Sequence, residues 1–318
     1  MALRETLGLG SISRRTRSVP FQSEAAAYVA LLKYVNAFGS WEDALDVARS
    51  VHAHRKAGAE SQRETMTYAL AASVLGLCRE SAASDDLFAI ALAGMPDPIE
   101  RTFAGLRWAS LRAKRQGNID AAEDLIDALD SDLSHASAHR DDKSVGFGML
   151  WNLRALLAVR RRDPKAAHAA VTRAIAHFEQ GNGHRTAAHA IGSEEARRYE
   201  WMARLNLIQL DIFAHTFVSA IEKLTILVDF SRENDPGSLH TSLSTLAYVH
   251  IQNDDPAAAL PPLLESHERL RAEYDPFVID QVRKMLIRCY IELGREKDAE
   301  RVSALPANFW LPTEMPGA

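Results

Sequence analysis

The chain has 318 residues, of which 47% are hydrophobic and 25% are charged, enough apolar content for one or two folded domains and too much for a disordered chain. Its formal net charge of -5 at pH 7 excludes the strong global positive field of many nucleic-acid-binding proteins. Cys78 and Cys289 are the only cysteines, which excludes a disulfide framework and a cysteine-based zinc site. No apolar run approaches the roughly 18 residues of a membrane span, so we expect a cytoplasmic protein without a membrane segment.

The first 22 residues, "MALRETLGLGSISRRTRSVPFQ", differ in composition from the rest of the chain. They carry four arginines against one acidic residue: Arg4, Arg14, Arg15 and Arg17. We predict a flexible basic tail over residues 1–22. An organelle transit peptide, which shares this Arg-, Ser- and Thr-rich composition, is the alternative.

Helix signals dominate from there to residue 304. Ser61 with Glu64 and Asp97 with Glu100 fit capping boxes, and three Asp-Pro pairs repeat the device of a cap followed by proline, at Asp163, Asp255 and Asp275. Segments such as "EAAAYVALLKYVNAF" and "QVRKMLIRCYIEL" place apolar residues three and four positions apart. Strand-like alternation is hard to find. The predicted fold class is all-α.

The stretch "GSWEDAL", residues 39–45, recurs along the chain. Its small residue defines an anchor position, occupied in turn by Ala44, Ser84, Ala122, Ala167, Ala220, Ala259 and Ala299, with spacings of 40, 38, 45, 53, 39 and 40 residues. Five residues before the anchor stand Gly39, Gly117 and Gly294, where a helix end with positive φ suits glycine; the other copies have Arg79, Arg162, His215 and Asp254 there. The pattern predicts seven helical hairpins.

Large residues precede the anchors by 13 or 16 positions, on the helix before each turn, as at Tyr68, Leu106 and Leu286. This arrangement resembles the tetratricopeptide repeat, and the best copies are "YVALLKYVNAFGSWEDAL", "LRWASLRAKRQGNIDAAEDL" and "LIRCYIELGREKDAERV". The resemblance covers residues 23–304 and implies a right-handed α-solenoid of about seven hairpins. The chain departs from the family in its spacings near 40 rather than about 34, around Arg79 and Ser81, and at Arg204 and Asp211. An irregular helical bundle is the alternative.

Three further segments are interpreted as irregular. Residues 131–147 and 178–192 are polar or contain glycine, and we expect them to form extended loops between repeats. Residues 305–318 contain Phe309, Trp310 and Leu311 between prolines, and we expect this tail to cap the apolar edge of the last repeat.

The resemblance also implies a ligand-binding face on the first helix of each hairpin, which lines the concave groove in this family. The corresponding positions hold Lys33, Asn36, Arg107, Lys114, Asn152, Asn206, Gln209, Ser244, Tyr248, Gln281, Lys284 and Arg288. Asn and Gln pair with a peptide backbone, while Lys and Arg suit a carboxylate. A solvated groove that needs polar residues for no other reason is the alternative at each position.

Enzyme chemistry has weaker support. Arg49 and His54 in "RSVHAH" fit the Arg-x4-His spacing that resembles the active-site motif of certain helical ribonucleases, and "RDPKAAH" at 162–168 fits a looser version. A modifying enzyme with a site around His184 and His189 is a further alternative. His135 and His139 match no metal-binding motif, and no phosphate-binding loop is present, so we predict no metal and no cofactor.

A basic concentration lies on two consecutive first helices, and it would suit an acidic or phosphate-bearing partner if the two helices stack. Its members are Arg101, Arg107, Arg112, Lys114, Arg115, Arg154, Arg160, Arg161 and Arg162. The sequence overall predicts a non-catalytic scaffold for a peptide or protein segment. Nucleic acid is disfavoured as a partner, and the oligomeric state stays open. Similarity to bacterial peptide-sensing regulators and to helical-repeat sensor domains of transcriptional activators implies a regulatory role, exerted through another protein because no helix-turn-helix is found.

Overall fold

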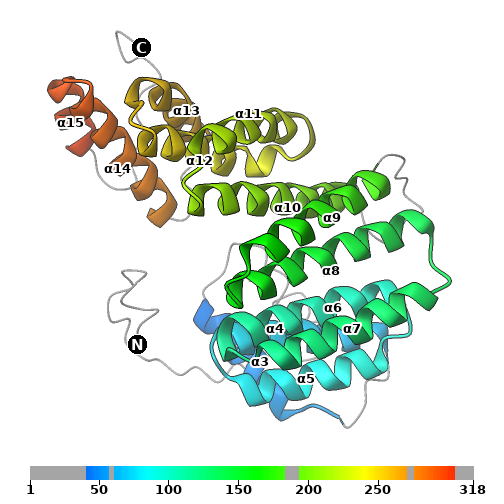
Figure 1. The fold of residues 1–318 in the computed structure, drawn as a ribbon. Coiled ribbons are helices and arrows are strands. Elements are labelled where there is room, and N and C mark those ends of the chain that lie inside the picture. Colours follow the sequence, from blue (N-terminus) through cyan, green and yellow to red (C-terminus); the bar gives the residue numbers. More distant parts are fainter. Residues whose placement is uncertain (1–40, 57–60, 183–192, 271–275, 305–318) are drawn as a thin grey trace. The chain divides into compact units, whose positions relative to one another are not determined.

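A computed structural model describes residues 41–56, 61–182, 193–270 and 276–304. In these ranges the chain forms thirteen α-helices and no β-strand (Figure 1), so the predicted all-α class is confirmed. The described helices fall into two compact units, α3 to α9 and α10 to α15.

The described part of the N-terminal unit contains seven α-helices that pack mainly as sequential pairs, α4 with α5, α6 with α7 and α8 with α9 (Figure 1). Their bounds are α3 Trp41–Ala53, α4 Gln62–Leu77, α5 Ser81–Gly94, α6 Pro98–Leu111, α7 Ile119–His135, α8 Arg140–Arg160 and α9 Pro164–Asn182. A π-helical turn, Arg112–Gln116, continues α6. The first predicted hairpin contributes only α3 here, because its first helix lies outside the described residues.

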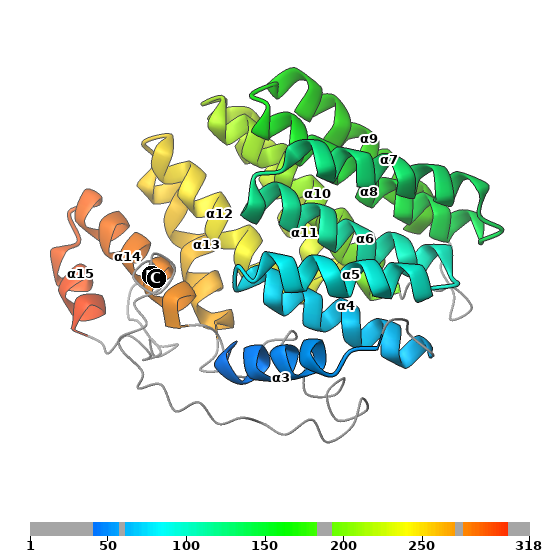
Figure 2. The same ribbon diagram turned by 90° about the horizontal axis from the view of Figure 1, so that it is seen from below.

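The C-terminal unit repeats the same pairing, with α10 on α11, α12 on α13 and α14 on α15 (Figure 2). The bounds are α10 Ser193–Phe213, α11 Phe217–Asn234, α12 Leu239–Gln252, α13 Pro256–Arg269, α14 Pro276–Glu292 and α15 Glu296–Ser303. A short 3-10 turn, Pro236–Ser238, joins α11 to α12. Together the two units hold six complete helical hairpins in the described part of the chain, in agreement with the predicted repeat.

The anchor residues are where each second helix meets its partner. All seven are buried, with at most 5% of their surface exposed: Ala44, Ser84, Ala122, Ala167, Ala220, Ala259 and Ala299. The one hydroxyl among them is satisfied, since Ser84 Oγ donates to the Ala72 carbonyl across the hairpin at 2.7 Å. Small side chains at this position allow two helices to approach closely, which explains why the pattern recurs.

The turn before each anchor has the same backbone geometry, whichever residue type stands five positions before the anchor. Six residues in the described ranges have positive φ, between 56° and 70°, and each lies five positions before an anchor: Arg79, Gly117, Arg162, His215, Asp254 and Gly294. Five of these turns close with an amide bonded to the carbonyl five residues earlier, as from Asp163 N to Ala158 O at 2.9 Å. This is the Schellman ending of a helix. The prediction that these turns need positive φ is confirmed beyond its glycines; Gly39 lies outside the described residues.

The predicted helix starts are also confirmed. The cap side chains accept amides from the first turn at 2.7–3.3 Å: Ser61 from Glu64, Asp97 from Ile99 and Glu100, Asp163 from Ala166, and Asp255 from Ala258. Each bond satisfies an amide that has no partner within its own helix. Asp275 lies outside the described residues, although α14 begins at the following proline as expected.

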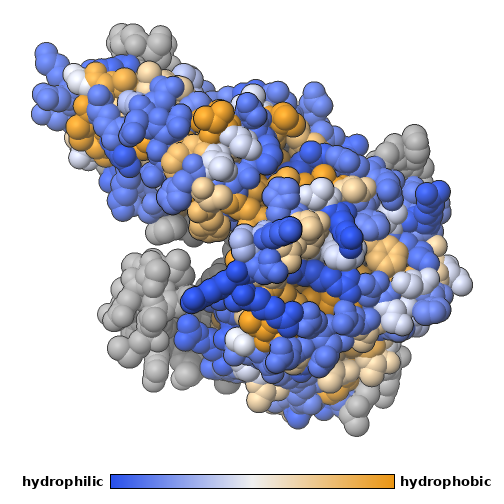
Figure 3. All heavy atoms as spheres, viewed as in Figure 1, coloured by the Kyte–Doolittle hydropathy of each residue, from blue (hydrophilic) through white to orange (hydrophobic). Residues whose placement is uncertain are grey.

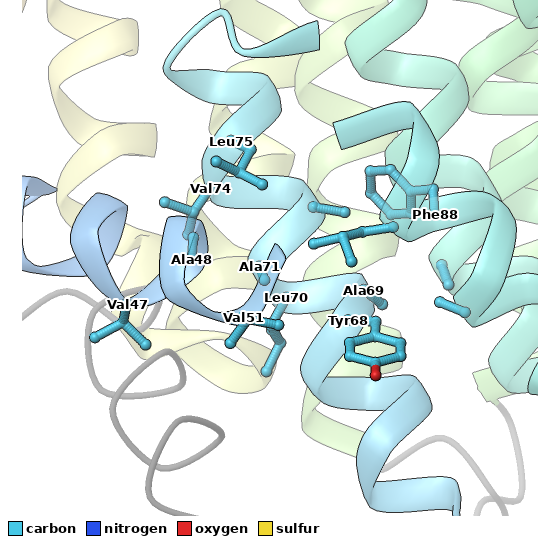
Figure 4. Close-up of a cluster of buried hydrophobic side chains, with 14 of the residues drawn as sticks. Val47, Ala48, Val51, Tyr68, Ala69, Leu70, Ala71, Val74, Leu75 and Phe88 are labelled. Atoms are coloured by element: carbon cyan, nitrogen blue, oxygen red, sulfur yellow. The ribbon is translucent and has the colours of Figure 1, made fainter. Parts of the chain in front are cut away.

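The core of the N-terminal unit is centred on α4, which is apolar around most of its circumference. Tyr68, Leu70 and Val74 are at most 3% exposed and pack among residues of α3 and α5 (Figure 4). The helix contacts α3, α5 and α6, so little of its surface is left for water. A helix surrounded on several sides in this way needs apolar residues on every face.

The predicted loop over 131–147 is wrong. Residues 131–135 complete α7, and residues 140–147 begin α8, which leaves only four connecting residues. Leu133 and Val145 are fully buried, and Asp142 and Ser144 of α8 are buried with them, while most other polar residues of the segment are exposed or partly exposed. The connection is closed by Lys143 Nζ, which donates to the Ser134 carbonyl at 2.8 Å. The local excess of polar residues therefore belongs to two helices rather than to a loop.

The predicted loop over 178–192 is wrong at its start, where residues 178–182 complete α9. Phe178 is fully buried, and Gly181 lies against α8, where a Cβ would be 2.8 Å from the Asp141 carbonyl oxygen. Glycine thus marks a close helix approach here, not a loop. Residues 183–192 lie outside the described residues, as do the predicted tails at 1–22 and 305–318.

Two polar residues stand where the repeat expects apolar ones, and both are paired. Arg204 donates to the buried carboxylate of Glu200 at 2.7 Å and stacks on Phe230 of α11 at 5.2 Å. Asp211 accepts a hydrogen bond from Ser219 of α11 at 3.2 Å and forms an ion pair with Lys223. These contacts join α10 to α11, so the departures from the repeat pattern stabilise the same hairpin by polar means.

Candidate functional site

The first helix of each hairpin, here termed the A helix, carries the residues that the sequence assigned to ligand binding. The A helices in the described part are α4, α6, α8, α10, α12 and α14. Seven assigned residues are exposed: Arg107, Lys114, Gln209, Tyr248, Gln281, Lys284 and Arg288. Asn152, Asn206 and Ser244 are partly buried, and Lys33 and Asn36 lie outside the described residues.

One face of the A helices can be followed from hairpin to hairpin. We call A stripe the positions 18, 15, 11 and 8 residues before each anchor, because steps of three and four keep them on one side of a helix. Gln209, Tyr248 and Arg288 share the position 11 before the anchor, and Ser244 and Lys284 share the position 15 before it. Asn206 lies 14 before its anchor and is therefore off this face.

Exposed apolar residues lie on the A stripe of the C-terminal unit. Met202, Tyr248 and Ile291 are 39%, 42% and 57% exposed, and they stand 18, 11 and 8 residues before their anchors. Neighbouring A helices are in direct contact, since Trp201 Nε1 of α10 donates to Ser242 Oγ of α12 at 2.9 Å and α12 packs on α14. The stripe of this unit therefore mixes exposed apolar side chains with amides and cations.

The charged residues of this stripe are held by salt bridges within their own helix. Lys284 Nζ lies 2.7 Å from Asp280, and Arg288 Nε lies 2.7 Å from Glu292. The hydrogen bond to Glu292 raises the pKa of Arg288 above its usual value. Exposed pairs of this kind contribute little to stability. Lys284 and Arg288 can therefore replace their intrahelical carboxylates by other acidic groups with a small change in free energy.

The A stripe of the N-terminal unit is more polar. It presents Arg107 and Lys114 from α6, Asn152 from α8 and the 42% exposed Val159, while its position on α4 is filled by buried residues. A Cβ on Gly76 of α4 would lie 2.7 Å from Leu111, which shows how closely α6 covers this face. Among the described A helices of this unit, α6 and α8 therefore offer the more accessible stripe.

The basic concentration predicted on α6 and α8 divides into two groups. Four cations pair with acidic residues of neighbouring helices: Arg101 with Asp132, Arg112 with Asp85, Arg154 with Asp127 and Asp130, and Arg161 with Glu123. Five others form no ion pair in the part of the chain that the structure describes: Arg107, Lys114, Arg115, Arg160 and Arg162. The accessible positive surface is smaller than the sequence indicated.

The π-helical end of α6 is organised around Asp85 of α5. Its Oδ1 accepts hydrogen bonds from Trp108 Nε1 and, at 3.3 Å, from Gln116 Nε2, and Arg112 Nε lies 3.7 Å away. Trp108 also stacks on Phe88 at 5.7 Å and carries the Arg112 guanidinium over its ring at 4.1 Å. This cluster fixes the unusual turn from which Lys114 and Arg115 project.

The Arg49 and His54 pair of the ribonuclease hypothesis does not converge. Arg49 forms ion pairs with Glu80 and Asp46, and His54 Nδ1 lies 2.8 Å from the Ser50 carbonyl oxygen. Five residues along a helix correspond to a rotation of about 140°, so the two side chains leave from different faces. Of the looser pair, Arg162 occupies a helix-ending turn and His168 is exposed on α9.

No group of three or more metal-binding side chains is present among the described residues. His139 accepts the Asp141 amide at 3.2 Å as the cap of α8, and His135 Nδ1 lies 2.7 Å from the Ser131 carbonyl oxygen. Both histidines therefore have local structural roles. His184 and His189 lie outside the described residues.

Sequence reasoning missed the apolar members of the A stripe, Met202, Val159 and Ile291. Their signal was present, because each stands at a stripe position in a hairpin where another stripe position had already been assigned. It also missed three exposed apolar residues elsewhere, Phe213, Val218 and Ile226, which are 61–74% exposed at or near the α10–α11 turn and along α11.

Comparison with known proteins supports the fold. No family model matches the sequence, and no curated protein shows significant sequence similarity. The structure of BtubC (BKLC) from P. vanneervenii matches with a TM-score of 0.53 and 17% identity, covering 80% of this chain and 96% of that chain. The apo form of RapI matches with a TM-score of 0.55 and 11% identity, covering 88% and 73%. In the described ranges no helix is long and apolar enough to cross a membrane. Given its paired helices, repeated turns and these structural neighbours, the chain is a TPR-like helical repeat protein.

Proposed function

We propose that this protein is a non-catalytic scaffold that binds a peptide or protein segment on the A stripe of its C-terminal unit. The observation that supports this most directly is the exposure of Met202, Tyr248 and Ile291 at different A-stripe positions of three A helices. Large apolar side chains at the surface lose contact with water when a partner covers them. Exposure at successive stripe positions favours a segment that runs across the helices.

The polar residues of the stripe supply direction and specificity to such a complex. Gln209 offers both a donor and an acceptor to a peptide backbone, and Lys284 and Arg288 can exchange their intrahelical carboxylates for acidic groups of the segment. We therefore infer that the preferred segment combines an apolar side chain with an acidic one. A regulatory role would follow if binding of this segment altered the affinity for a second protein.

Two isoleucines provide a matched test of this surface. Ile291 on the A stripe is 57% exposed and Ile226 on α11 is 61% exposed, so an aspartate at either site disturbs the fold to a similar, small extent. A display library of random peptides is selected on the full chain, and the enriched peptides are titrated against the wild type, Ile291→Asp and Ile226→Asp. Burying one isoleucine contributes about 1.5–3 kcal/mol, so Ile291→Asp should weaken binding roughly tenfold or more.

The enriched peptides should bind Ile226→Asp as tightly as the wild type. Loss of binding in Ile226→Asp alone, or an equal loss in both variants, would place the binding surface away from the A stripe. Circular dichroism of the two variants confirms that each keeps its helical content. A library that yields no enriched peptide on the folded full chain would argue against a linear segment as the ligand.

A further inference from the structure

An uncompensated positive cluster lies in the N-terminal unit, where α6 and α8 end. We call cation corner the three residues Lys114, Arg115 and Arg160, of which the first two lie in the π-helical turn and the third ends α8. All three are exposed, and none forms an ion pair within the described residues. The surface over the end of α8 and the start of α9 is strongly hydrophilic in Figure 3. The helices α6 and α8 contact each other directly, and both end on the same side of the unit (Figure 1).

Two of the three charges act on the third. The pKa of Lys114 is lowered, first by partial burial of its side chain and then by the positive charges of Arg160 and Arg115. Arg112 and Arg154, which belong to the same two helical segments, differ because each faces carboxylates of a neighbouring helix. Within the described ranges, the cation corner therefore gathers positive charge without a counter-ion.

The backbone does not neutralise these charges either. Where α6 ends, the Arg112 carbonyl accepts the Asn118 amide at 3.0 Å, and where α8 ends, the Ala158 carbonyl accepts the Asp163 amide at 2.9 Å. The helix dipole favours cations at these ends, but it carries only about half a charge per helix. Three full charges on two helix ends exceed this, so a net positive site remains.

We propose that the cation corner binds a compact oxyanion with more than one negative charge, namely a phosphate group carried by a small molecule. Two arginines that both act on one lysine suit one concentrated negative charge better than the spaced carboxylates of an extended peptide. Arginine and lysine are the residues that hold phosphate oxygens through charge-assisted hydrogen bonds. The tryptophans of these helices, Trp108 and Trp151, already stack against arginines of the chain, which leaves no free ring for a nucleobase. The site lies on other helices than the proposed peptide surface and does not depend on it.

The probe is inorganic pyrophosphate, titrated calorimetrically into the full chain at constant ionic strength, with triglutamate and sulfate as comparison anions. The variants are Lys114→Gln and Arg160→Gln, and the matched control is Lys297→Gln, which removes the same charge from an exposed lysine of α15 that has no ion pair within the described ranges. Each variant at the corner should weaken pyrophosphate binding about tenfold or more, and Lys297→Gln should change it less than twofold. Lys114→Arg should retain most of the affinity.

Proton uptake gives a second readout. Because a bound anion favours the charged form of Lys114, binding just below the ordinary lysine pKa of about 10.4, where pyrophosphate itself is fully ionised, should be accompanied by proton uptake, measured by titration in buffers of different ionisation enthalpy. This uptake should disappear in Lys114→Gln. The proposal is overturned if pyrophosphate does not bind, if all three glutamine variants lose affinity equally, or if triglutamate binds more tightly than pyrophosphate, which would assign the corner to an acidic peptide instead.

Discussion

The turn geometry before each anchor allows a stability prediction with opposite signs at two sites. Arg162 has a φ of 61° in the turn between α8 and α9, and Gly117 has a φ of 70° in the equivalent turn between α6 and α7. A residue with a Cβ is disfavoured in this region by about 1–2 kcal/mol. We predict that Arg162→Gly stabilises the protein and that Gly117→Ala destabilises it.

The structure separates the backbone effect from other contributions. A Cβ added at Gly117 meets no atom within 4 Å, so no clash adds to the strain of Gly117→Ala. The Arg162 side chain is exposed and forms no ion pair in the described part of the chain, so little is lost with it. Glycine gives the unfolded chain more conformational entropy than alanine or arginine, which favours unfolding by roughly 0.4–1 kcal/mol. This entropy reduces both the gain from Arg162→Gly and the loss from Gly117→Ala. The expected net changes are about +0.5–1 kcal/mol for Arg162→Gly and about -0.5 to -1.5 kcal/mol for Gly117→Ala.

Urea unfolding of the full chain, followed by circular dichroism, measures both changes. Arg162→Ala is the control, because it removes the arginine side chain while keeping a Cβ at positive φ, and its stability should stay close to that of the wild type. The reasoning fails if Arg162→Ala stabilises as much as Arg162→Gly, since the side chain rather than φ would then be the cause. It also fails if Gly117→Ala is neutral.

Three further outcomes are expected in the same unfolding assay. Gly148→Ala should destabilise by about 1–3 kcal/mol, because the new Cβ would lie 2.8 Å from a ring carbon of the fully buried Phe178, and Phe178→Leu in the same chain should recover part of the loss. Asp85→Ala should destabilise by about 1–3 kcal/mol, since Trp108 Nε1 loses its acceptor, whereas Asp85→Asn should lose less; equal losses would contradict the role of the acceptor. Burial lowers the pKa of His267, so the unfolded chain takes up a proton below about pH 6.5 before the folded protein does, and stability should fall as the pH decreases through this range. His267→Gln should reduce that pH dependence, and an unchanged slope would refute the assignment.

The hairpin repeat was largely predictable because it depends on local chemistry. A small anchor such as Ala122 and a glycine such as Gly117, five residues apart, encode a helix end and a close approach in one short stretch. Capping residues such as Asp97 act on amides of their own first turn. Interactions of this kind depend little on the rest of the fold, so the sequence reveals them directly.

The loops were less predictable, because a polar segment and a polar helix face have similar composition. Residues 131–147 contain charges and serines throughout, yet Leu133 and Val145 bury one side of each helix. The spacing of apolar residues from Leu133 to Val145 does not follow one helical period, because the connection at 136–139 interrupts it. The two buried helix faces can be recognised in the sequence only when the position of this connection is known. The loop predicted over 178–192 was wrong at its start for a related reason, because Gly181 marks a close contact between helices rather than a loop.

The sequence by itself determined the helical class, the positions of the turns and the identity of the buried anchors, since all of these follow from residues within one hairpin. Only the tertiary structure decided which surface residues remain accessible. Arg112 and Arg154 look equivalent to Lys114 and Arg160 in the sequence, but acids from other helices pair with the first two, and no described acid pairs with Lys114 or Arg160. Charge compensation acts across helices that are distant in the sequence, and its outcome is set by packing.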